Sequence, residues 1–397
     1  MGDRPLRVAL FTGSYNFIAD GVALTLNRLV AYLERNGVEV LIVAPVARRP
    51  AFAHVGEIAA APSMPFPFRP EYRLTFGLTR ALRRRLRDFA PDIVHLATPD
   101  LLGAQAMIFA RKLGTPVVAS FHTRYDTYLK DYGVGLLERP VAAWMRHFYG
   151  ACEEVYAPSG SMIEILRAAG YAENLRLWGR GVDTERFSPA KRSAAFRAGV
   201  GVGDNTPIVA FVGRLVREKR LDTLVAVGKS LAGARLLVVG DGPDRATLQE
   251  ALPAAIFTGF LEGEALAEAY ASSDIFLFPS DTETFGAVTL EAMASGLPTV
   301  CADAAGSRSL VEHGETGFLA PPGDSAAFAA AVERLVAEPD LRRRMGQTAR
   351  ARSEAFSWDA DMARLLARYE ALAGRERAPL AEKPFDDPAL APDRVTL

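Results

Sequence analysis

The sequence predicts an α/β protein that contains two doubly wound parallel sheets, one after the other. Apolar runs of strand length alternate with stretches of helical periodicity, a pattern typical of parallel sheets with helices on both faces. A polar, proline-containing segment at residues 181–193 interrupts this alternation, which then begins again. The chain has 397 residues, of which 49% are hydrophobic, so it is long enough for two domains with large cores.

The first half opens with a buried strand expected at residues 7–13. The helix expected at residues 22–37 has apolar residues at helical spacing and ends at Gly37, a residue type favoured just after a helix. Further strands are expected at residues 38–45, 91–98, 115–123 and 153–159. We place a first domain at residues 1–185.

The second half repeats the pattern. Strands are expected at residues 207–214, 234–242, 254–260, 273–280 and 297–303, each followed by a helix. We therefore expect a second domain at residues 186–357. Residues 378–397 are rich in Pro and Asp, which predicts a disordered tail.

Composition and charge narrow the class of protein. The formal net charge of -1 gives no reason to expect nucleic acid as a partner. Cys152 and Cys301 are far apart in sequence, which predicts neither a disulfide framework nor a zinc site and fits a reducing cytosol. No stretch approaches 18 uninterrupted apolar residues, and the first apolar run is too short for a signal sequence. We expect a cytoplasmic protein that is soluble or contacts the inner face of the plasma membrane from one side.

Two glutamates follow a predicted strand of the second half. In doubly wound folds, ligands bind beyond the carboxyl ends of the strands. Glu283 lies in the loop "DTETFG", and Glu291 lies in the following helix, about 80° away around its axis. The amides of residues 285–288 would be donors at the start of that helix, suited to phosphate oxygens or sugar hydroxyls. The two acids would contact different parts of one extended ligand, and a carboxylate can accept from a ribose diol. In the alternative interpretation, Glu283 caps the helix and Glu291 is solvated surface.

Two cations follow another strand of the second half. Arg214 directly follows the strand, and Lys219 comes five residues later, at the entry of a helix. Such a pair can neutralise a leaving diphosphate. The alternative is an exposed, solvated pair.

Two segments of the first half have polar residues or glycine after a strand. In "FHTRYDTY", His122 ends a strand and is followed by Arg124, Tyr125 and Asp126, which fits a sugar- or acceptor-binding site. In "NFIADGVAL", Gly21 allows the backbone to approach a ligand closely. His95 follows an apolar run and is interpreted as a structural histidine.

The segment "RALRRRLRDF" predicts a basic amphipathic helix. Leucines recur at helical spacing between the arginines, and such helices can lie on anionic lipid. The alternative is a solvated helix face. The candidate membrane contacts are Arg80, Arg83, Arg84 and Arg87. The pair Asp359 and Asp361 opens a helix, where Asp serves capping, so no metal site is expected there.

Together these segments resemble the retaining GT-B glycosyltransferases of family 4, the "group 1" class that uses nucleotide-sugar donors. The resemblance covers about residues 5–375. It rests on Glu283 and Glu291 with "FG" between them, followed by "EAMASGLPTV", and on "VGRLVREK", "VVGDGPDRATL", "YASSDIFLFPS" and "HGETGFLAPPGD" in that family's order. The segments "FHTRYDTY" and "NLRLWGRGVDTERFSPAKRS" are similar to sulfoquinovosyl-diacylglycerol synthases and related mannosyl- and glucuronosyl-lipid transferases.

The resemblance implies a GT-B fold, with two Rossmann-like domains facing each other across a cleft and a last helix, at about residues 358–375, that returns to the first domain. It implies a metal-independent hexosyltransferase without a cofactor, whose substrate is a UDP- or GDP-sugar. The implied catalytic residues are His122, Glu283, Arg214 and Lys219. The implied donor-binding residues are Gly21, Arg214, Lys219, Glu283, Phe285, Gly286, Ala287, Val288 and Glu291. The acceptor side would be formed by Arg124, Tyr125 and Asp126.

The implied reaction moves a sugar from the donor to an acceptor hydroxyl of a membrane lipid, with retention of the anomeric configuration. A soluble or polysaccharide acceptor is the first alternative, and a nucleotide-sugar epimerase of the same fold is the second. An NAD-linked oxidoreductase and a sugar-binding protein without activity are further alternatives, although "GDGPDR" lacks the third glycine of a dinucleotide fingerprint.

Overall fold

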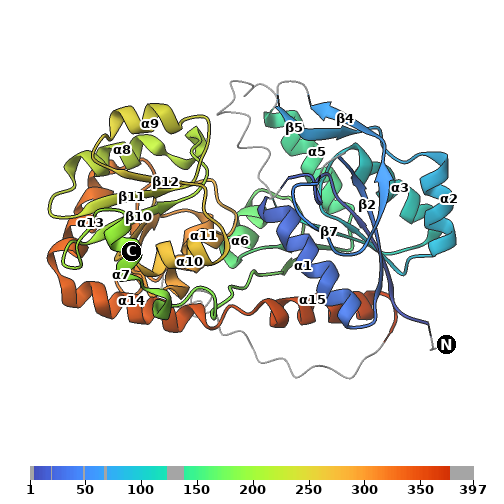
Figure 1. Cartoon of the computed structure of the whole chain (residues 1–397). Coiled ribbons are helices and arrows are strands. Elements are labelled where there is room, and N and C mark those ends of the chain that lie inside the picture. Colours follow the sequence, from blue (N-terminus) through green and yellow to red (C-terminus); the bar gives the residue numbers. More distant parts are fainter. Residues whose placement is uncertain (1–3, 19, 48–49, 67–68, 123–137, 376–397) are drawn as a thin grey trace. The chain divides into compact units, whose positions relative to one another are not determined.

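The computed structural model describes residues 4–18, 20–47, 50–66, 69–122 and 138–375 (Figure 1). The chain forms two compact units. The first contains the described residues up to Trp178 and those from Asp359 onward, and the second contains Gly179–Trp358.

The first unit is built on a seven-stranded parallel sheet with the order β3-β2-β1-β6-β7-β8-β9. Its strands are β1 (Arg7–Phe11), β2 (Glu39–Pro45), β3 (Glu57–Ala61), β6 (Ile93–Leu96), β7 (Val117–Ser120), β8 (Glu154–Ala157) and β9 (Leu175–Leu177). Its helices are α1 (Gly21–Arg35), α2 (Arg80–Phe89), α3 (Leu101–Leu113), α5 (Glu138–Gly150) and α6 (Gly160–Ala168). A separate antiparallel pair, β4 (Ser63–Phe66) and β5 (Arg69–Thr75), completes the unit.

The second unit is built on a six-stranded parallel sheet with the order β12-β11-β10-β13-β14-β15. Its strands are β10 (Ile208–Val212), β11 (Arg235–Val239), β12 (Ile256–Gly259), β13 (Ile275–Phe278), β14 (Thr299–Ala302) and β15 (Gly317–Ala320). Its α-helices are α7 (Ala194–Gly199), α8 (Leu221–Ser230), α9 (Arg245–Ala251), α10 (Gly263–Ala271), α11 (Ala287–Ala294), α12 (Ala305–Arg308), α13 (Ser325–Ala337) and α14 (Pro339–Ser353). Two short 3₁₀ helices are η2 (Pro189–Lys191) and η3 (Arg217–Lys219).

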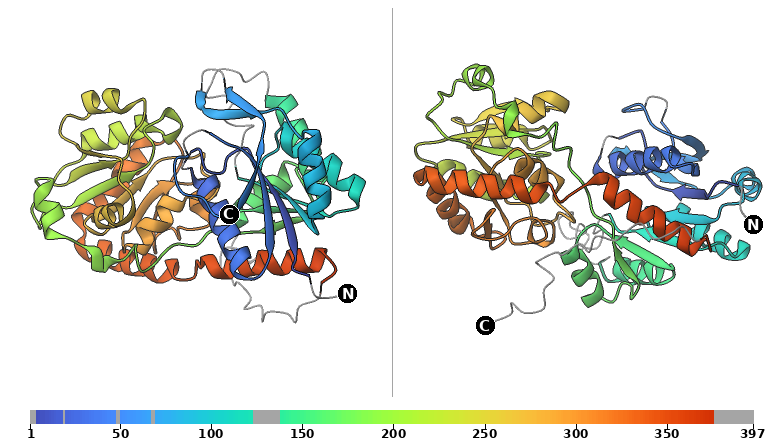
Figure 2. Two further views of the ribbon diagram at one scale, coloured as in Figure 1. Left: turned by 45° about the vertical axis from the view of Figure 1, so that its right-hand side comes forward. Right: turned by 90° about the horizontal axis from the view of Figure 1, so that it is seen from below.

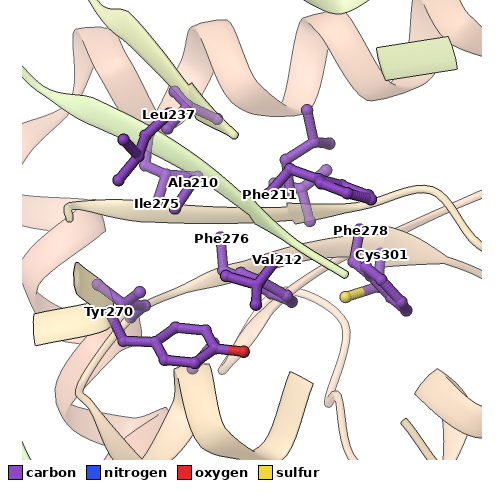
Figure 3. Packing of buried hydrophobic residues seen from close by; sticks show 14 of the residues in the cluster. Ala210, Phe211, Val212, Leu237, Tyr270, Ile275, Phe276, Phe278 and Cys301 are labelled. Carbon is purple, nitrogen blue, oxygen red and sulfur yellow. The ribbon is translucent and has the colours of Figure 1, made fainter. Parts of the chain in front are cut away.

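The predicted fold class, two doubly wound parallel sheets in series, is confirmed. The central strands β10 and β13 are buried along their whole length, and β1 is buried after Arg7, because helices cover both faces of each sheet and leave no side for water. In the core of the second unit, the rings of Phe276 and Phe278, two positions apart on β13, stack on each other, and Tyr270 of α10 packs against Phe276 (Figure 3).

The structure also contains strands that the sequence patterns do not predict. These are β3, β4, β5, β9 and β15. Strands β9 and β15 have only three and four residues, and β4 has no buried residue. Short or exposed strands give too few apolar residues in alternation to be detected.

The last helix, α15 (Trp358–Leu372), runs beside α1 (Figure 2). Its residues from Asp359 onward pack on the first unit. The hydroxyl of Tyr369 bonds to Nδ1 of His95, whose Nε2 bonds to the hydroxyl of Ser120. His95 is fully buried, so it has the structural role expected from the sequence.

Candidate active site

The order of the second sheet reverses between β10 and β13, which pair in parallel through Val209 and Ile275. In open α/β sheets, the crevice at such a reversal is where ligands bind. The loops that leave the carboxyl ends of β10 and β13 lie beside each other here. Thr282 of one loop donates a hydrogen bond to the carbonyl of Glu218 in the other, at 3.4 Å.

The two loops bring Lys219 and Glu283 into contact. The Lys219 ammonium forms an ion pair with Oε1 of Glu283, and both side chains are more than three-quarters buried, with exposed fractions of 17% and 24%. Ser280 donates a second hydrogen bond to the same carboxylate oxygen at 3.3 Å. The ammonium also lies 5.6 Å from the ring centroid of Phe278. Sequence reasoning placed both residues at a ligand site, but their direct contact was not predicted.

A second ion pair holds the two loops together. The Arg220 guanidinium bonds to both carboxylate oxygens of Asp281, with distances of 2.7 to 3.1 Å. The planar fork of a guanidinium fits a carboxylate in this two-point arrangement, which fixes orientation as well as distance. Sequence reasoning missed this pair. The sequence did contain a signal for it: Arg220 follows Lys219 directly, and Asp281 lies two positions before Glu283.

Arg214 follows β10 and is exposed. The amide of Leu215 bonds to the carbonyl of Asp241 at 2.9 Å, so the backbone next to Arg214 is fixed. Among the residues that the structure describes, no acidic side chain pairs with Arg214. The guanidinium can therefore bind an anionic ligand without first breaking an ion pair.

The start of α11 offers amide donors at the same edge of the sheet. Gly286 precedes the helix with a φ of 88°, a left-handed conformation that glycine adopts without strain. Within the described parts of the chain, the amides of residues 285–288 bond to no acceptor. Unpaired amides at a helix N-terminus bind anions and polar oxygens. Phe285 is buried, Ala287 is exposed and Val288 is half-buried.

Gly306 fixes the position of the Glu283 loop. A Cβ atom at position 306 would lie 2.6 Å from Cβ of Glu283 and 3.0 Å from its carbonyl oxygen. These separations leave no room for a side chain at position 306. Glycine at this position therefore lets the loop after β13 pack directly on α12.

Glu291 lies farther along α11 and is half-buried. Its Oε2 accepts a hydrogen bond from the hydroxyl of Tyr270 at 3.1 Å. Glu283 and Glu291 thus have different partners, an ammonium for one and a phenol for the other. Sequence reasoning missed Tyr270. Its signal was a tyrosine in the small-residue helix "GEALAEAYA", where a buried hydroxyl needs a partner.

The remaining predicted site residues belong to the first unit. Gly21 is the first residue of α1, and the Asp20 side chain caps that helix by accepting from the amide of Ala23 at 2.7 Å. His122 follows β7, and its ring packs against the Trp178 ring in a T-shaped arrangement at a centroid distance of 5.8 Å. Arg124, Tyr125 and Asp126 lie outside the described residues.

Helix α2 has the predicted amphipathic pattern. Leu82 and Leu86 are buried, whereas Arg80, Arg83, Arg84 and Arg87 are exposed. Arg85 pairs with Glu57, and the Arg87 guanidinium lies 5.7 Å from the centroid of the Phe109 ring. No helix in the described ranges is long and apolar enough to cross a membrane.

The described residues hold no cluster of three or more His, Cys, Asp or Glu side chains that is suited to a metal ion. At the start of α15, Asp359 pairs with Arg35, and Asp361 pairs with Arg364. Both carboxylates thus take part in ion pairs.

Cations, carboxylates and unbonded amides at a sheet reversal are groups that can bind a phosphorylated, hydroxyl-rich ligand. Comparison with known families gives two matches. The profile described as "Glycosyltransferase Family 4" matches residues 19–186. The profile described as "Glycosyl transferases group 1" matches residues 193–352.

Several relatives are 34% to 42% identical to this chain over 90% or more of its length. A GDP-mannose-dependent alpha-mannosyltransferase of Mycobacterium tuberculosis is 40% identical over 376 residues, which cover 93% of this chain and 98% of the relative. A protein of the same name from Mycolicibacterium smegmatis is 42% identical over 377 residues, with the same coverage. The sulfoquinovosyl transferase SQD2 of Arabidopsis thaliana is 34% identical over 366 residues, which cover 90% of this chain and 72% of the relative.

Solved structures agree on the fold. Sucrose-phosphate synthase from Thermosynechococcus elongatus matches with a TM-score of 0.78 and 23% identity, over 93% of this chain and 99% of that one. The HepE protein of Anabaena, solved with UDP and glucose, matches with a TM-score of 0.70 and 21% identity, over 92% of this chain and 100% of that one.

The fold and the family profiles define a GT-B glycosyltransferase. The chain belongs to family 4 of the glycosyltransferases, the group 1 class. The predicted class of reaction, sugar transfer from a nucleotide-diphosphate donor by a retaining hexosyltransferase family, is confirmed by this membership. Membership also favours that reaction over the epimerase, oxidoreductase and sugar-binding alternatives.

Proposed function

We propose that the carboxyl edge of the second sheet binds the nucleotide-sugar donor. The single observation that carries this proposal is the Lys219–Glu283 contact at the sheet reversal. Arg214 and Lys219 would bind the diphosphate. Glu283 would accept hydrogen bonds from sugar hydroxyls, while the amides at the start of α11 would donate to phosphate or sugar oxygens. Glu291 would accept from the ribose.

The chemistry of these groups suits departure of a nucleoside diphosphate. When the bond between the anomeric carbon and the phosphate oxygen breaks, negative charge develops on the leaving diphosphate. Cations and helix N-terminal amides beside that oxygen would stabilise the charge as it develops. An oxygen of the leaving phosphate can take the proton of the acceptor hydroxyl as it attacks from the same face, which retains the anomeric configuration. We therefore expect the side chains of Arg214 and Lys219 to stabilise the charge on the leaving diphosphate.

We propose GDP-mannose as the donor. Two relatives at 40% and 42% identity carry that donor in their names, whereas the HepE structure was solved with UDP at only 21% identity. Relatedness over the full length therefore favours the guanine nucleotide and mannose. A UDP-sugar is the second candidate.

We further propose that the acceptor is a membrane lipid, used at the cytoplasmic face of the membrane. Helix α2 exposes five arginines outside its buried leucine stripe, of which Arg85 pairs with Glu57. Such a surface attracts anionic lipid headgroups. A relative from Streptococcus pneumoniae, 27% identical over 85% of this chain, is named alpha-monoglucosyldiacylglycerol synthase. The domain assignment and the roles of Gly21 and His122 stay predictions. We propose that the first unit holds the acceptor side and the second unit the donor.

The test is a donor screen followed by a transfer assay. GDP should raise the melting temperature more than UDP, because a ligand that binds only the folded state stabilises it. GDP-[¹⁴C]mannose with vesicles that contain phosphatidylinositol or diacylglycerol should then yield a labelled lipid. Equal stabilisation by GDP and UDP would contradict the donor assignment. Labelled product in the aqueous phase alone would contradict the lipid acceptor, and an altered sugar in the absence of any acceptor would indicate an epimerase.

A further inference from the structure

Tyr270 connects the core of the second unit with its candidate donor site. The side chain comes from α10 and is fully buried. Its ring packs edge-on against Phe187 at a centroid distance of 5.7 Å and contacts Phe276 at 5.8 Å. Figure 3 shows the ring in the core beside Phe276, with the hydroxyl oxygen at its free end. The phenol is therefore held in one position by its surroundings.

The hydroxyl of Tyr270 has two acceptors on α11. It lies 3.1 Å from Oε2 of Glu291 and 3.2 Å from the carbonyl oxygen of Val288. A phenol has one proton to donate, and an ionised carboxylate is a stronger acceptor than a peptide carbonyl. Burial raises the pKa of Tyr270 well above its ordinary value, and the nearby Glu291 carboxylate raises it further. The hydroxyl is thus protonated, and able to donate, at neutral pH.

A glutamate on a helix surface ordinarily samples several rotamers, and fixing it on a ligand costs conformational entropy. A hydrogen bond from a rigid, buried phenol reduces that cost before the ligand arrives. It also leaves acceptor capacity, because a carboxylate offers about four lone-pair positions and the phenol occupies one of them.

We propose that Tyr270 is a positioning residue that orients the Glu291 carboxylate toward the ribose hydroxyls of the donor. The inference rests on the proposed role of Glu291 in ribose binding. It adds that a core residue 21 positions earlier in the chain determines how well that contact forms. Tyr270 itself would touch neither donor nor acceptor.

The test compares ribose and deoxyribose nucleotides. GDP, 2′-deoxy-GDP and 3′-deoxy-GDP are titrated calorimetrically into the full-length wild type and into Tyr270→Phe, which removes only the hydroxyl. The wild type should prefer GDP over at least one deoxy analogue by about tenfold, the usual effect of a hydrogen bond to a charged group. In Tyr270→Phe, that preference should shrink to about threefold or less, and KM for the donor should rise while kcat stays nearly unchanged.

The chain offers a matched control for the loss of a buried phenol. Tyr156 in the first unit is also buried and donates to a carboxylate, Oε2 of Glu154, at 2.9 Å. Tyr156→Phe should lower the melting temperature as Tyr270→Phe does but leave the preference for ribose intact. A general loss of stability would therefore not imitate the expected result.

Glu291→Ala separates the two levels of the proposal. Loss of the ribose preference in both Glu291→Ala and Tyr270→Phe supports the ribose contact of Glu291 and the positioning role of Tyr270. Loss in Glu291→Ala with a full preference in Tyr270→Phe overturns the role of Tyr270 and keeps that of Glu291. A full preference in Glu291→Ala overturns the ribose contact and, with it, the inference.

Discussion

The Lys219 ammonium and the Glu283 carboxylate form an ion pair at the carboxyl edge of the second sheet, although 64 positions separate them in the chain. Ser280 donates to the same carboxylate, so Glu283 is oriented from two sides. In the absence of a donor, each of these groups neutralises the other. A diphosphate could then replace Glu283 as the partner of Lys219 and leave the carboxylate to the sugar hydroxyls.

Replacing Glu283 with Gln should reduce kcat/KM by about a hundredfold or more, because hydrogen bonds that strengthen in the transition state are lost. Steady-state kinetics with saturating acceptor measures the effect. Glu312→Gln is the matched control, since Glu312 pairs with Arg352 before β15, at the opposite edge of the same sheet. A loss of activity below about tenfold for Glu283→Gln would contradict the assigned role.

Replacing Arg214 with Ala should weaken GDP binding by about ten- to a hundredfold, because a charged hydrogen bond to the diphosphate is removed. Binding of guanosine, which has no phosphate, should not change. Isothermal titration with both ligands gives the comparison. Arg235→Ala is the control, because Arg235 starts β11 at the opposite end of the sheet. An equal loss for guanosine would show that Arg214 acts on the fold and not on phosphate.

Replacing Gly306 with Ala should lower activity while the protein stays folded. The new Cβ would meet the Glu283 loop at 2.6 Å, so the loop must shift and carry the carboxylate with it. A displacement of a catalytic group by about 1 Å can cost about a hundredfold in rate. Gly199→Ala is the control, since an added Cβ there meets nothing within 4 Å in the described residues apart from its own helix turn. Full activity of Gly306→Ala would mean that the position of Glu283 is not critical.

Acid should destabilise the first unit through Glu154. Burial raises the pKa of this carboxyl, but hydrogen bonds from Arg368 and Tyr156 and the charge of Arg368 outweigh burial and hold the pKa below its ordinary value of 4.5. The unfolded chain then binds the proton more readily than the folded one. The stabilisation is therefore present above pH 4.5 and is lost as the pH falls through the folded pKa.

Arg368→Met tests whether Glu154 couples the stability of the first unit to pH. It also tests whether the bond from Arg368 to Glu154 holds α15 on that unit. The variant should melt below the wild type near neutral pH, and the difference should shrink in acid, as measured by thermal melts across that range. Arg35→Met is the control, because Arg35 and Asp359 are mostly exposed and such pairs contribute little. A difference in melting temperature that is constant with pH would argue against Glu154 as the titrating group.

Charge reversal on α2, with Arg83→Glu and Arg84→Glu together, should abolish binding to vesicles that contain phosphatidylserine, because each basic residue near the surface contributes about 1 kcal/mol. Cosedimentation measures the fraction of protein bound to the vesicles. The same double change at Arg343 and Arg344 of α14, which are also exposed, should leave binding unchanged. If both double variants lose binding equally, the attraction is a general charge effect.

The sequence by itself determined the two parallel sheets and the positions where functional side chains follow strands. It could do so because burial on both faces of a sheet leaves a continuous apolar run, and the residue after such a run lies at the ligand edge. Glu283, Arg214 and Lys219 were found in this way, and the family resemblance supplied their expected roles.

Only the tertiary structure decided which of these residues touch. The contact of Lys219 with Glu283 depends on β10 and β13 being neighbours, which is a property of strand order and not of either segment. The hydrogen bond from Tyr270 to Glu291 depends on how α10 and α11 pack. Periodicity along a chain records whether a side chain is buried, but a pairing between distant side chains is set by the arrangement of elements in space.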